Sequence, residues 1–507
     1  MYIGLDIGTS GVKAVLFSET GEMIKRACRE YPVRGEGQQL ELCPQEVCGA
    51  VIDALRGLSG MRCEIRAIGI SSLGEACVLL DKDGKVLRNA ILPGDKRGAE
   101  YLPEIKKNEN EIIKTTGLPL NATYSLLKLL WVREHEPGLY EKTKRVMLFG
   151  DYIAYMLTGE ACISFSLASR TLAFDIHKMK FPSSLFGCSG IDPALFSSPV
   201  NPERKIGGLL PEIARRTGLP SGTPVYAGGH DQPCAAIGAG AFYKGEAADS
   251  IGTSECITAV LGEEKLEPDF IKDTNFPCEP FLVNDMFNTI AFTHTAGRLL
   301  KWFTESVMQA GEKESFHALD LQCKESPSGL MVLPHFSGAG TPTMDHLSVG
   351  AVVGLNLHSS AIDIYQAIME SVSYEMKTNL DRLSQNGIKL HRIYAVGGGA
   401  SSDIWLQYRQ TFTASLCALQ SARRQAPWAR QPRRRLGTDA TEVWRKPVKI
   451  WCTSRRNIFQ TESWPRLFPR SMKNIKGCMS KSKEFTGRDD NGEKACNWHV
   501  GVYLWPV

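Results

Sequence analysis

A pattern of strand, glycine turn and strand occurs twice in this chain, about half a chain apart. The first copy is Ile7-Gly8-Thr9-Ser10 followed by Ala14-Val15-Leu16, and the second is Ile251-Gly252-Thr253-Ser254 followed by Ala259-Val260-Leu261, with one inserted residue. Because a whole unit recurs at so large a separation, the repeat indicates duplicated domains rather than a short-period solenoid. Two such hairpins facing one cleft could hold a polyphosphate between them.

The length and composition are typical of a soluble globular protein with at least two domains. At 507 residues the chain is too long for a single hydrophobic core. Its 59 basic and 55 acidic side chains are too evenly balanced to indicate nucleic acid or an anionic membrane as a partner.

The 15 cysteines are scattered without a Cys-x-x-Cys pair, which favours reduced thiols over disulfides or a zinc site. Met1 leads directly into an apolar strand without a signal-like segment, so we expect a cytoplasmic protein without a membrane span.

The first hairpin carries residue types that suit a phosphate and a metal ion. Asp6 ends the first strand and could hold hydrated Mg²⁺, while Thr9, Ser10 and Lys13 would lie near phosphate oxygens. The alternative is a plain hairpin in which Asp6 only accepts hydrogen bonds from the turn. The second copy near Gly252 favours the phosphate interpretation.

An acid follows paired glycines in Gly228-Gly229-His230-Asp231. The glycines allow a sharp turn and a close approach to a ligand, so Asp231 could face that ligand and act as a general base. His230 could also be catalytic, but a lone histidine here is more typical of a structural role.

Charged residues follow two other short apolar strands. Glu75 comes after the strand at Ala67–Ser72, and Asp95 and Arg97 come after Ala90-Ile91-Leu92. Ligands of α/β proteins bind at such strand ends, so these three side chains could hydrogen-bond the hydroxyls of a sugar or polyol. The alternative is that they are solvated loop residues.

Apolar periodicity and caps predict several helices, and one of them follows a glycine run. The predicted helices cover residues 124–134, 233–241 and 362–383, with a strand running into a helix over 145–157. Gly397-Gly398-Gly399-Ala400 precedes a further helix that starts near Asp403. Glycines before a helix N-terminus let the backbone lie against a nucleotide.

Together these segments resemble the FGGY carbohydrate kinases, the sugar-kinase branch of the actin-like, hexokinase-like and Hsp70-like ATPases. The resemblance covers about residues 1–422 and implies an α/β fold with two ribonuclease-H-like domains flanking a nucleotide cleft. The sugar-binding domain would span residues 1–243, and the ATP-binding domain residues 244–422. The motifs that carry the resemblance are Asp6-Ile7-Gly8-Thr9-Ser10, Gly228-Gly229-His230-Asp231, Gly252-Thr253-Ser254, the Gly338–Pro342 loop and Gly397-Gly398-Gly399-Ala400.

The resemblance also implies ATP-dependent phosphorylation of a sugar hydroxyl, with ATP and Mg²⁺ in the cleft. Asp231 would be the general base that accepts the proton of the attacking hydroxyl. The sugar would bind Glu75, Asp95 and Arg97, and the metal would bind Asp6. The nucleotide and its phosphates would contact Gly8, Thr9, Ser10, Lys13, Gly252, Thr253, Ser254, Gly398, Gly399 and Ala400.

Within the family, the overall pattern resembles the xylulose kinases, so a ketopentose such as xylulose is the expected substrate. Two departures keep a deoxyketose or a polyol open. Ser72-Leu73-Gly74-Glu75 replaces the Gln-Met-His-Gly stretch of those enzymes, and Pro93 stands where a tryptophan commonly precedes the Asp-x-Arg motif. We expect a small-molecule partner and neither nucleic acid nor a membrane, and a homodimer is an open option.

Two other classes of protein stay open. An actin-like or Hsp70-like ATPase with a protein partner would share the hairpins and the duplication, although the charged strand ends favour a small polyhydroxy acceptor. A non-catalytic sugar binder would result if the C-terminal tail abolished nucleotide binding. A nicotinamide enzyme is disfavoured, because Gly238-Ala239-Gly240 is followed by Tyr243 where the dinucleotide fingerprint needs a small residue.

The sequence changes character after Ala422. Arginines become frequent and no amphipathic period follows, which is typical of a disordered basic extension. A second interpretation comes from the genetic code. In a shifted reading frame, the last base of each codon is read with the first two bases of the next codon. Some choice of codons for residues 425–431 then encodes Gly-Ala-Met-Gly-Ala-Ala. That sequence fits the helix expected in the family, and the single codon of Trp428 forces its second glycine. We therefore expect that residues 423–507 are a frameshifted, non-native tail.

Overall fold

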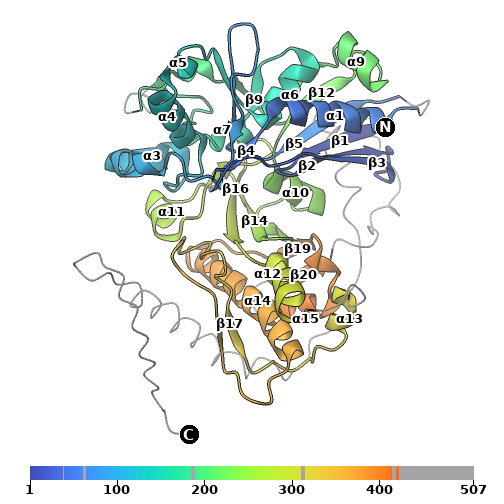
Figure 1. Ribbon diagram of the computed structural model, residues 1–507, viewed down its shortest axis with the longest axis vertical. Coiled ribbons are helices and arrows are strands. Elements are labelled where there is room, and N and C mark those ends of the chain that lie inside the picture. The colour runs from blue at the N-terminus through green and yellow to red at the C-terminus, as the bar shows by residue number, and fades with distance from the viewer. Residues whose placement is uncertain (38, 61–63, 184–188, 310–314, 414–417, 422–507) are drawn as a thin grey trace.

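The computed structural model describes the chain except for residues 38, 61–63, 184–188, 310–314, 414–417 and 422–507. The frameshift predicted for residues 423–507 therefore lies outside the described residues. Within the described part, two six-stranded sheets lie one above the other, with the N-terminal half of the chain forming the upper one (Figure 1).

The first sheet has the strand order β11-β12-β5-β1-β2-β3. Its first strand buries every second side chain, as expected for a strand with one face on a core. Its strands are β1 (Tyr2–Ile7), β2 (Gly11–Phe17), β3 (Met23–Glu30), β5 (Ala67–Ser72), β11 (Lys205–Gly208) and β12 (Pro224–His230).

The second sheet has the strand order β15-β16-β14-β13-β19-β20. Its strands are β13 (Glu246–Ile251), β14 (Glu255–Gly262), β15 (Glu279–Pro280), β16 (Phe287–Thr293), β19 (Arg392–Val396) and β20 (Ala418–Ser421).

The two sheets share a five-stranded core of one topology and differ in the sixth strand, because β11 lies beyond β12 in the first sheet and β15 lies beyond β16 in the second. In the first sheet β1 pairs antiparallel with β2 and parallel with β5, and in the second β13 pairs antiparallel with β14 and parallel with β19. The next neighbours correspond as well, because β3 and β16 are antiparallel additions while β12 and β20 are parallel ones. The prediction of a duplicated, two-domain α/β fold is thus confirmed.

Helices cover the sheets, and one of them lies between the two halves. In the first domain α1 (Pro44–Leu58) packs on β2 and β3, and in the second α14 (Ala361–Gln385) packs beside α15 (Asp403–Thr413). Helix α10 (Asp231–Ala239) contacts β12 of the first sheet and β13 and β14 of the second, and it occupies the middle of Figure 1. The residue that begins α10 therefore sits where the domains meet.

Smaller elements complete the described fold. The remaining helices are α2 (Leu102–Ile105), α3 (Glu109–Thr116), α4 (Ser125–His135), α5 (Pro137–Tyr140), α6 (Phe149–Thr158), α7 (Phe165–Ser169), α9 (Pro211–Thr217), α11 (Pro268–Thr274), α12 (Gly297–Trp302) and α13 (Phe316–Asp320). The remaining strands are β4 (Glu41–Leu42), β6 (Cys77–Leu80), β7 (Ala90–Ile91), β8 (Arg145–Leu148), β9 (Cys162–Ser164), β10 (Ser198–Val200), β17 (Met331–Leu333) and β18 (Ala351–Val353). Across the described ranges, a helix with the length and apolar character needed to cross a bilayer is not found.

Helix α10 starts earlier than predicted. We expected a helix over residues 233–241, whereas the structure has Asp231–Ala239. Pro233 is tolerated inside the first turn because the amide groups there have no intrahelical partner. Asp231 is favourable as the first helical residue, since a carboxylate interacts well with the positive end of the helix dipole.

Candidate functional site

Three neighbouring parallel strands of the first sheet end at the same edge. Ile7 of β1 and His230 of β12 both pair with Ser72 of β5. The residues that follow these strands are the Gly8 turn, the segment leading to Glu75, and Asp231. The carboxyl ends of parallel strands are where α/β proteins bind ligands, so the fold brings these three sequence predictions to one edge.

Asp231 is the first residue of α10 and sits in a strained turn. Gly228 has a φ of 58°, and a Cβ there would overlap the carbonyl oxygen of Ile70, so only glycine fits. The Asp231 side chain is 36% exposed. Burial, followed by the negative charges of Glu75 and Asp6, raises its pKa to about 7. A carboxylate with this proton affinity can take a proton near neutral pH, and its exposed side leaves room for the donor.

His230 lies beside the carboxylate without neutralising it. Its Nε2 lies 3.3 Å from Asp231 Oδ1. Burial, and then the positive charge of Arg170, lower the His230 pKa well below its usual value. The imidazole is therefore neutral and brings no positive charge to Asp231.

The first predicted phosphate turn is a tight hairpin with its hydroxyls exposed. The Gly8 amide donates to the Gly11 carbonyl at 2.9 Å, and Tyr31 donates its hydroxyl hydrogen to the Gly8 carbonyl at 2.6 Å. Thr9 and Ser10 are exposed in this turn. The hairpin thus offers two hydroxyl groups to an incoming ligand.

Asp6 and Lys13 face each other across the first hairpin, in register on β1 and β2. Asp6 Oδ1 accepts a hydrogen bond from Ser71 Oγ at 3.0 Å. Lys13 is exposed and Asp6 is half-buried. Asp6, the predicted metal ligand, therefore lies near the carboxyl ends of the parallel strands, where Asp231 also lies.

The second predicted phosphate turn rests on α12. The amides of Ala296 and Arg298 both donate to the Thr253 carbonyl, at 3.2 and 3.0 Å. Thr253 and Ser254 are exposed, as their counterparts are in the first turn. In the strand that follows, burial and then the charge of Asp231 raise the pKa of Cys256.

The glycine run before α15 packs on this second hairpin. A Cβ on Gly397 would lie 2.6 Å from the Ile251 carbonyl oxygen, so the backbones approach more closely than a side chain allows. Gly398 is exposed and Ala400 is buried. The structure thus brings residues 252–254 and 397–400 together, as their predicted common ligand requires.

Glu75 points into a buried ion cluster. It has a φ of 64°, and its carbonyl accepts a hydrogen bond from Ser125 Oγ at 2.7 Å. Its Oε1 accepts from Arg170 Nε at 2.6 Å and also from Nη2, and Arg170 Nη1 pairs with Glu279. Every one of these bonds to the Glu75 carboxylate uses Oε1.

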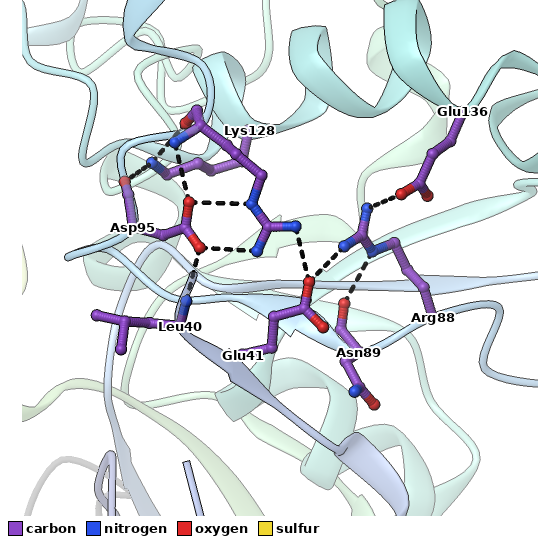
Figure 2. Close-up of polar contacts among 8 residues, drawn as sticks. Leu40, Glu41, Arg88, Asn89, Asp95, Lys128 and Glu136 are labelled. Atoms are coloured by element: carbon purple, nitrogen blue, oxygen red, sulfur yellow. Dashed lines mark hydrogen bonds and ion pairs between the residues drawn. The ribbon is translucent and has the colours of Figure 1, made fainter. Parts of the chain in front are cut away.

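Asp95 and Arg97 bond mainly to each other and to their surroundings. Figure 2 shows Asp95 with its neighbours Leu40 and Lys128. Asp95 accepts four hydrogen bonds, from the Leu40 amide at 2.7 Å, the Arg97 amide at 2.9 Å, and Arg97 Nε and Nη2 at 3.0 and 2.7 Å. The third guanidinium nitrogen of Arg97 pairs with Glu41 at 2.8 Å. Burial would raise the Asp95 pKa, but these hydrogen bonds outweigh it and leave the pKa below its usual value.

Helix α4 connects the loops of these sugar-site candidates. Lys128 Nζ donates to the carbonyls of Asp95 and Arg97 at 2.6 and 2.8 Å, while Ser125 of the same helix holds Glu75. Burial lowers the pKa of Lys128 to about 8. Lys128 is buried in a helix that the sequence predicts from its apolar face, of which Lys128 is not a part.

Sequence reasoning did not find Arg170 or Glu279. The available signal for Arg170 was weak: it is a single charge in the otherwise uncharged stretch from Phe165 to Phe174. Glu279 precedes a proline in a short strand and gives no signal of its own. Their pairing joins positions 109 residues apart, which no local pattern encodes.

The donor set fits the predicted Mg²⁺ and nucleotide. Groups of three or more histidine, cysteine or acidic side chains that could hold a metal are not found among the residues described. Mg²⁺ does not need such a cage, because it usually keeps several waters and binds one or two carboxylates with phosphate oxygens. Asp6 can supply that carboxylate beside the exposed hydroxyls of the first turn.

Relatives by sequence are sugar kinases. The xylulose kinase of Bacillus subtilis is 32% identical over 414 residues, which cover 80% of this chain and 82% of that protein. The xylulose kinase of Escherichia coli is 29% identical over 416 residues, covering 80% and 84%. A gluconokinase of B. subtilis is 27% identical over 423 residues. These relatives do not support the alternative of an ATPase with a protein partner.

Solved structures share the fold. The xylulose kinase of Rhodospirillum rubrum has a TM-score of 0.82 at 21% identity, covering 95% of this chain and 99% of that one. The glycerol kinase of Plasmodium falciparum with ADP has a TM-score of 0.78 at 19% identity, covering 96% and 99%. The predicted actin-like and hexokinase-like architecture is thereby confirmed.

The sequence of each half matches one domain of a single enzyme family. The N-terminal domain of the FGGY family of carbohydrate kinases matches residues 1–238, and the C-terminal domain of that family matches residues 247–424. The two matches together span most of the chain. With the duplicated sheets and the 32% identity to a curated relative, they show that this chain belongs to the FGGY family of carbohydrate kinases and is a sugar phosphotransferase.

Proposed function

We propose that this chain transfers the γ-phosphoryl group of ATP to a hydroxyl of a ketopentose such as xylulose, with Asp231 as the general base. The observation that carries the proposal is the position of Asp231, which begins α10 between the two sheets with a pKa raised to about 7. The xylulose kinases among the relatives favour the ketopentose.

The proton step follows from the local electrostatics. At neutral pH a large fraction of Asp231 is ionised, so it can accept the proton of a sugar hydroxyl as that oxygen attacks. His230 lies beside Asp231 as a neutral ring, so it does not pair with the carboxylate as a cation would. The proton affinity of the base therefore stays high.

The two hairpins and the glycine run would hold the nucleotide. ATP, when bound with Mg²⁺, supplies the phosphoryl group and the leaving group. Asp6 would hold the metal, and the exposed Thr9, Ser10 and Lys13 would contact phosphate oxygens. Gly252, Thr253 and Ser254 of the second turn would also contact phosphate oxygens. Gly398, Gly399 and Ala400 would lie against the adenosine part of the nucleotide.

On the sugar side, Glu75 is the residue most able to bind a hydroxyl. The bonds from Arg170 go to Oε1, so Oε2 can accept one. The Asp95 carboxylate and the Arg97 guanidinium are already engaged, and we propose that they shape the site by fixing the loop that carries them. The homodimer stays a prediction.

The test is a panel of ketoses and polyols assayed for ADP release. We expect a ketopentose to give the highest kcat/KM. Asp231→Ala should lower kcat by about 10²–10⁴-fold, the usual contribution of a general base, while Asp83→Ala, at an exposed turn, should leave it unchanged. Turnover of the Asp231 variant within about tenfold of the parent would contradict the role of Asp231.

A further inference from the structure

A short segment of the second domain, residues 278–284, lies against the first domain; we call it the crossing segment. The Cys278 amide donates to the Gly117 carbonyl at 2.7 Å, and Asn201 Nδ2 donates to Asn284 Oδ1. Leu282 lies so near Gly229 that an added Cβ there would overlap it. The crossing segment therefore contacts the strand that leads into the base.

Arg170 joins the crossing segment to Glu75. One guanidinium bonds Glu75 through Nε and Nη2 and pairs with Glu279 through Nη1. It also lies 5.1 Å from the ring centre of Tyr124. The Arg170 side chain is 12% exposed and Glu279 is fully buried. A single side chain thus binds one carboxylate from each domain, in a region with little water.

This ion cluster adjoins the base. A Cβ on Gly74 would meet Arg170 Cγ at 3.1 Å and His230 Cδ2 at 3.2 Å, so both side chains pack against the same glycine. The charge of Arg170 adds to burial in lowering the His230 pKa, and it opposes the effect of Glu75 on the Asp231 pKa. A displacement of Arg170 would change the surroundings of Asp231 as well as the position of Glu75.

We propose that Arg170 is a positioning residue that makes the placement of Glu75 beside Asp231 depend on contact between the two domains. The inference rests on the proposed function, because it concerns how the sugar side of that site is assembled. With the second domain in place, Glu279 fixes one end of the guanidinium and thereby holds its other end against Glu75. The sugar side is then complete only when the nucleotide-binding domain is docked, which keeps water from replacing the sugar hydroxyl.

A second arginine of the first domain provides a matched control. Arg88 pairs with Glu41 at 2.7 Å and Glu136 at 2.8 Å, and its guanidinium lies 5.5 Å from the ring centre of Trp131. Its side chain is 11% exposed, close to the 12% of Arg170. All its partners named here belong to the first domain. Arg88→Lys should therefore disturb a similar ion cluster without loosening a contact between domains.

The first measurement is amide hydrogen exchange in the crossing segment. Arg170→Lys keeps the charge, but lysine cannot bond two carboxylates with a rigid fork, and Glu279→Gln removes the charge of the second-domain partner. We expect exchange across residues 278–284 to rise by about tenfold or more in both variants, as local opening becomes easier, and to stay unchanged in Arg88→Lys. Unchanged exchange in Arg170→Lys, or an equal rise in Arg88→Lys, would overturn the inference.

The second measurement separates positioning from simple structural support. Arg170→Lys and Glu279→Gln should each lower kcat/KM for the sugar by about 10²-fold, the effect of a misplaced contact, while the KM for ATP changes by less than about threefold. The double variant should lose no more than the worse single one, because both changes break one link. Additive losses would overturn the inference.

The two proposals can fail separately. If the parent chain turned over no sugar in the panel, the proposed function would be wrong. Hydrogen exchange would then decide the link between Arg170 and the domains by itself, since it needs no activity.

Discussion

The Nε2 atom of His230 lies 3.3 Å from Oδ1 of Asp231, at the junction between β12 and α10. Burial and the charge of Arg170 keep the imidazole neutral, because they lower the His230 pKa well below its usual value. Asp231 thus has a neutral ring beside it rather than a paired cation. The pKa of Asp231 is raised by burial and by the nearby carboxylates of Glu75 and Asp6. A direct ion pair with His230 does not offset this rise, because the imidazole is neutral.

The first prediction is the pH dependence of turnover. Burial, then Glu75 and Asp6, raise the pKa of Asp231 to about 7, and a general base works only when it is ionised. We therefore expect kcat/KM to fall as the pH drops below about 7, with the slope of one proton. Initial rates from roughly pH 5 to pH 9 measure this. An acid limb centred near about pH 4, the usual aspartate value, would contradict it.

The second prediction concerns stability. The folded-state pKa of Asp231 is raised above the ordinary value of 3.8, so the folded state binds the proton more tightly than the unfolded state. The resulting stabilisation is complete below about pH 4 and is lost as the pH rises through about 7. Asp231→Asn cannot lose a proton, so it should melt a few degrees above the parent at pH 8 and show little advantage at low pH.

The size of this gain is limited by solvent. The Asp231 side chain is 36% exposed, and water screens the repulsion from the neighbouring carboxylates. Melting curves at pH 5 and pH 8 for parent and variant provide the measurement. The same melting difference at both pH values would contradict the assignment of the raised pKa to Asp231.

Local sequence patterns were enough to predict the hairpins, the Gly-Gly-His-Asp turn and the long helix α14. Each depends on residues close together in the chain, such as the glycine between two apolar runs at Ile7 and Ala14. The repeat of the hairpin also predicted the duplicated sheets, because strands of one pattern adopt one pairing.

Other features depend on contacts that sequence distance conceals. Asp95 looked available for a sugar, but the amide of Leu40, 55 residues earlier, takes part of its hydrogen-bonding capacity. Glu75 and Glu279 meet at Arg170 only because the domains pack together. The start of α10 was placed two residues late, because Pro233 reads as a helix start although the first turn tolerates it.

The third prediction contrasts two adjacent glycines. Gly228→Ala would place a Cβ against the Ile70 carbonyl at a φ of 58°, so both backbone strain and a backbone clash oppose it. We expect a loss of about 3 kcal/mol or more in the free energy of unfolding, enough to prevent folding in a marginal protein. Gly229→Ala meets the flexible end of Leu282 and, at 3.0 Å, Cβ and Oγ of Ser166 rather than backbone atoms, and it should cost about 1–3 kcal/mol. Equal denaturant midpoints for the two variants would contradict this explanation of the turn.

The position of the frame change can be bounded from both sides. Arg409 of α15 is buried and pairs with Asp249 and Glu255 beside the second hairpin. Strand β20 pairs with β19, and the match to the family's C-terminal domain extends to residue 424, so the printed frame is consistent with the fold up to Ala422. The shifted reading fits the family from Gln425 onwards. We therefore propose that the change lies between the codons of Ala422 and Gln425.

The last prediction is that the gene carries one more nucleotide in this interval than the printed reading uses. A chain with the frame restored directly after Ala422 should melt at a higher temperature and turn over faster than the present chain. The physical reason is composition: the printed frame puts six arginines among residues 423–435, where the shifted frame permits small apolar residues at 425–431, and unpaired arginines are rarely buried. Resequencing the gene and comparing melting curves of both chains test this. An unbroken present frame in the gene, together with equal melting temperatures and turnover, would show that the tail is native.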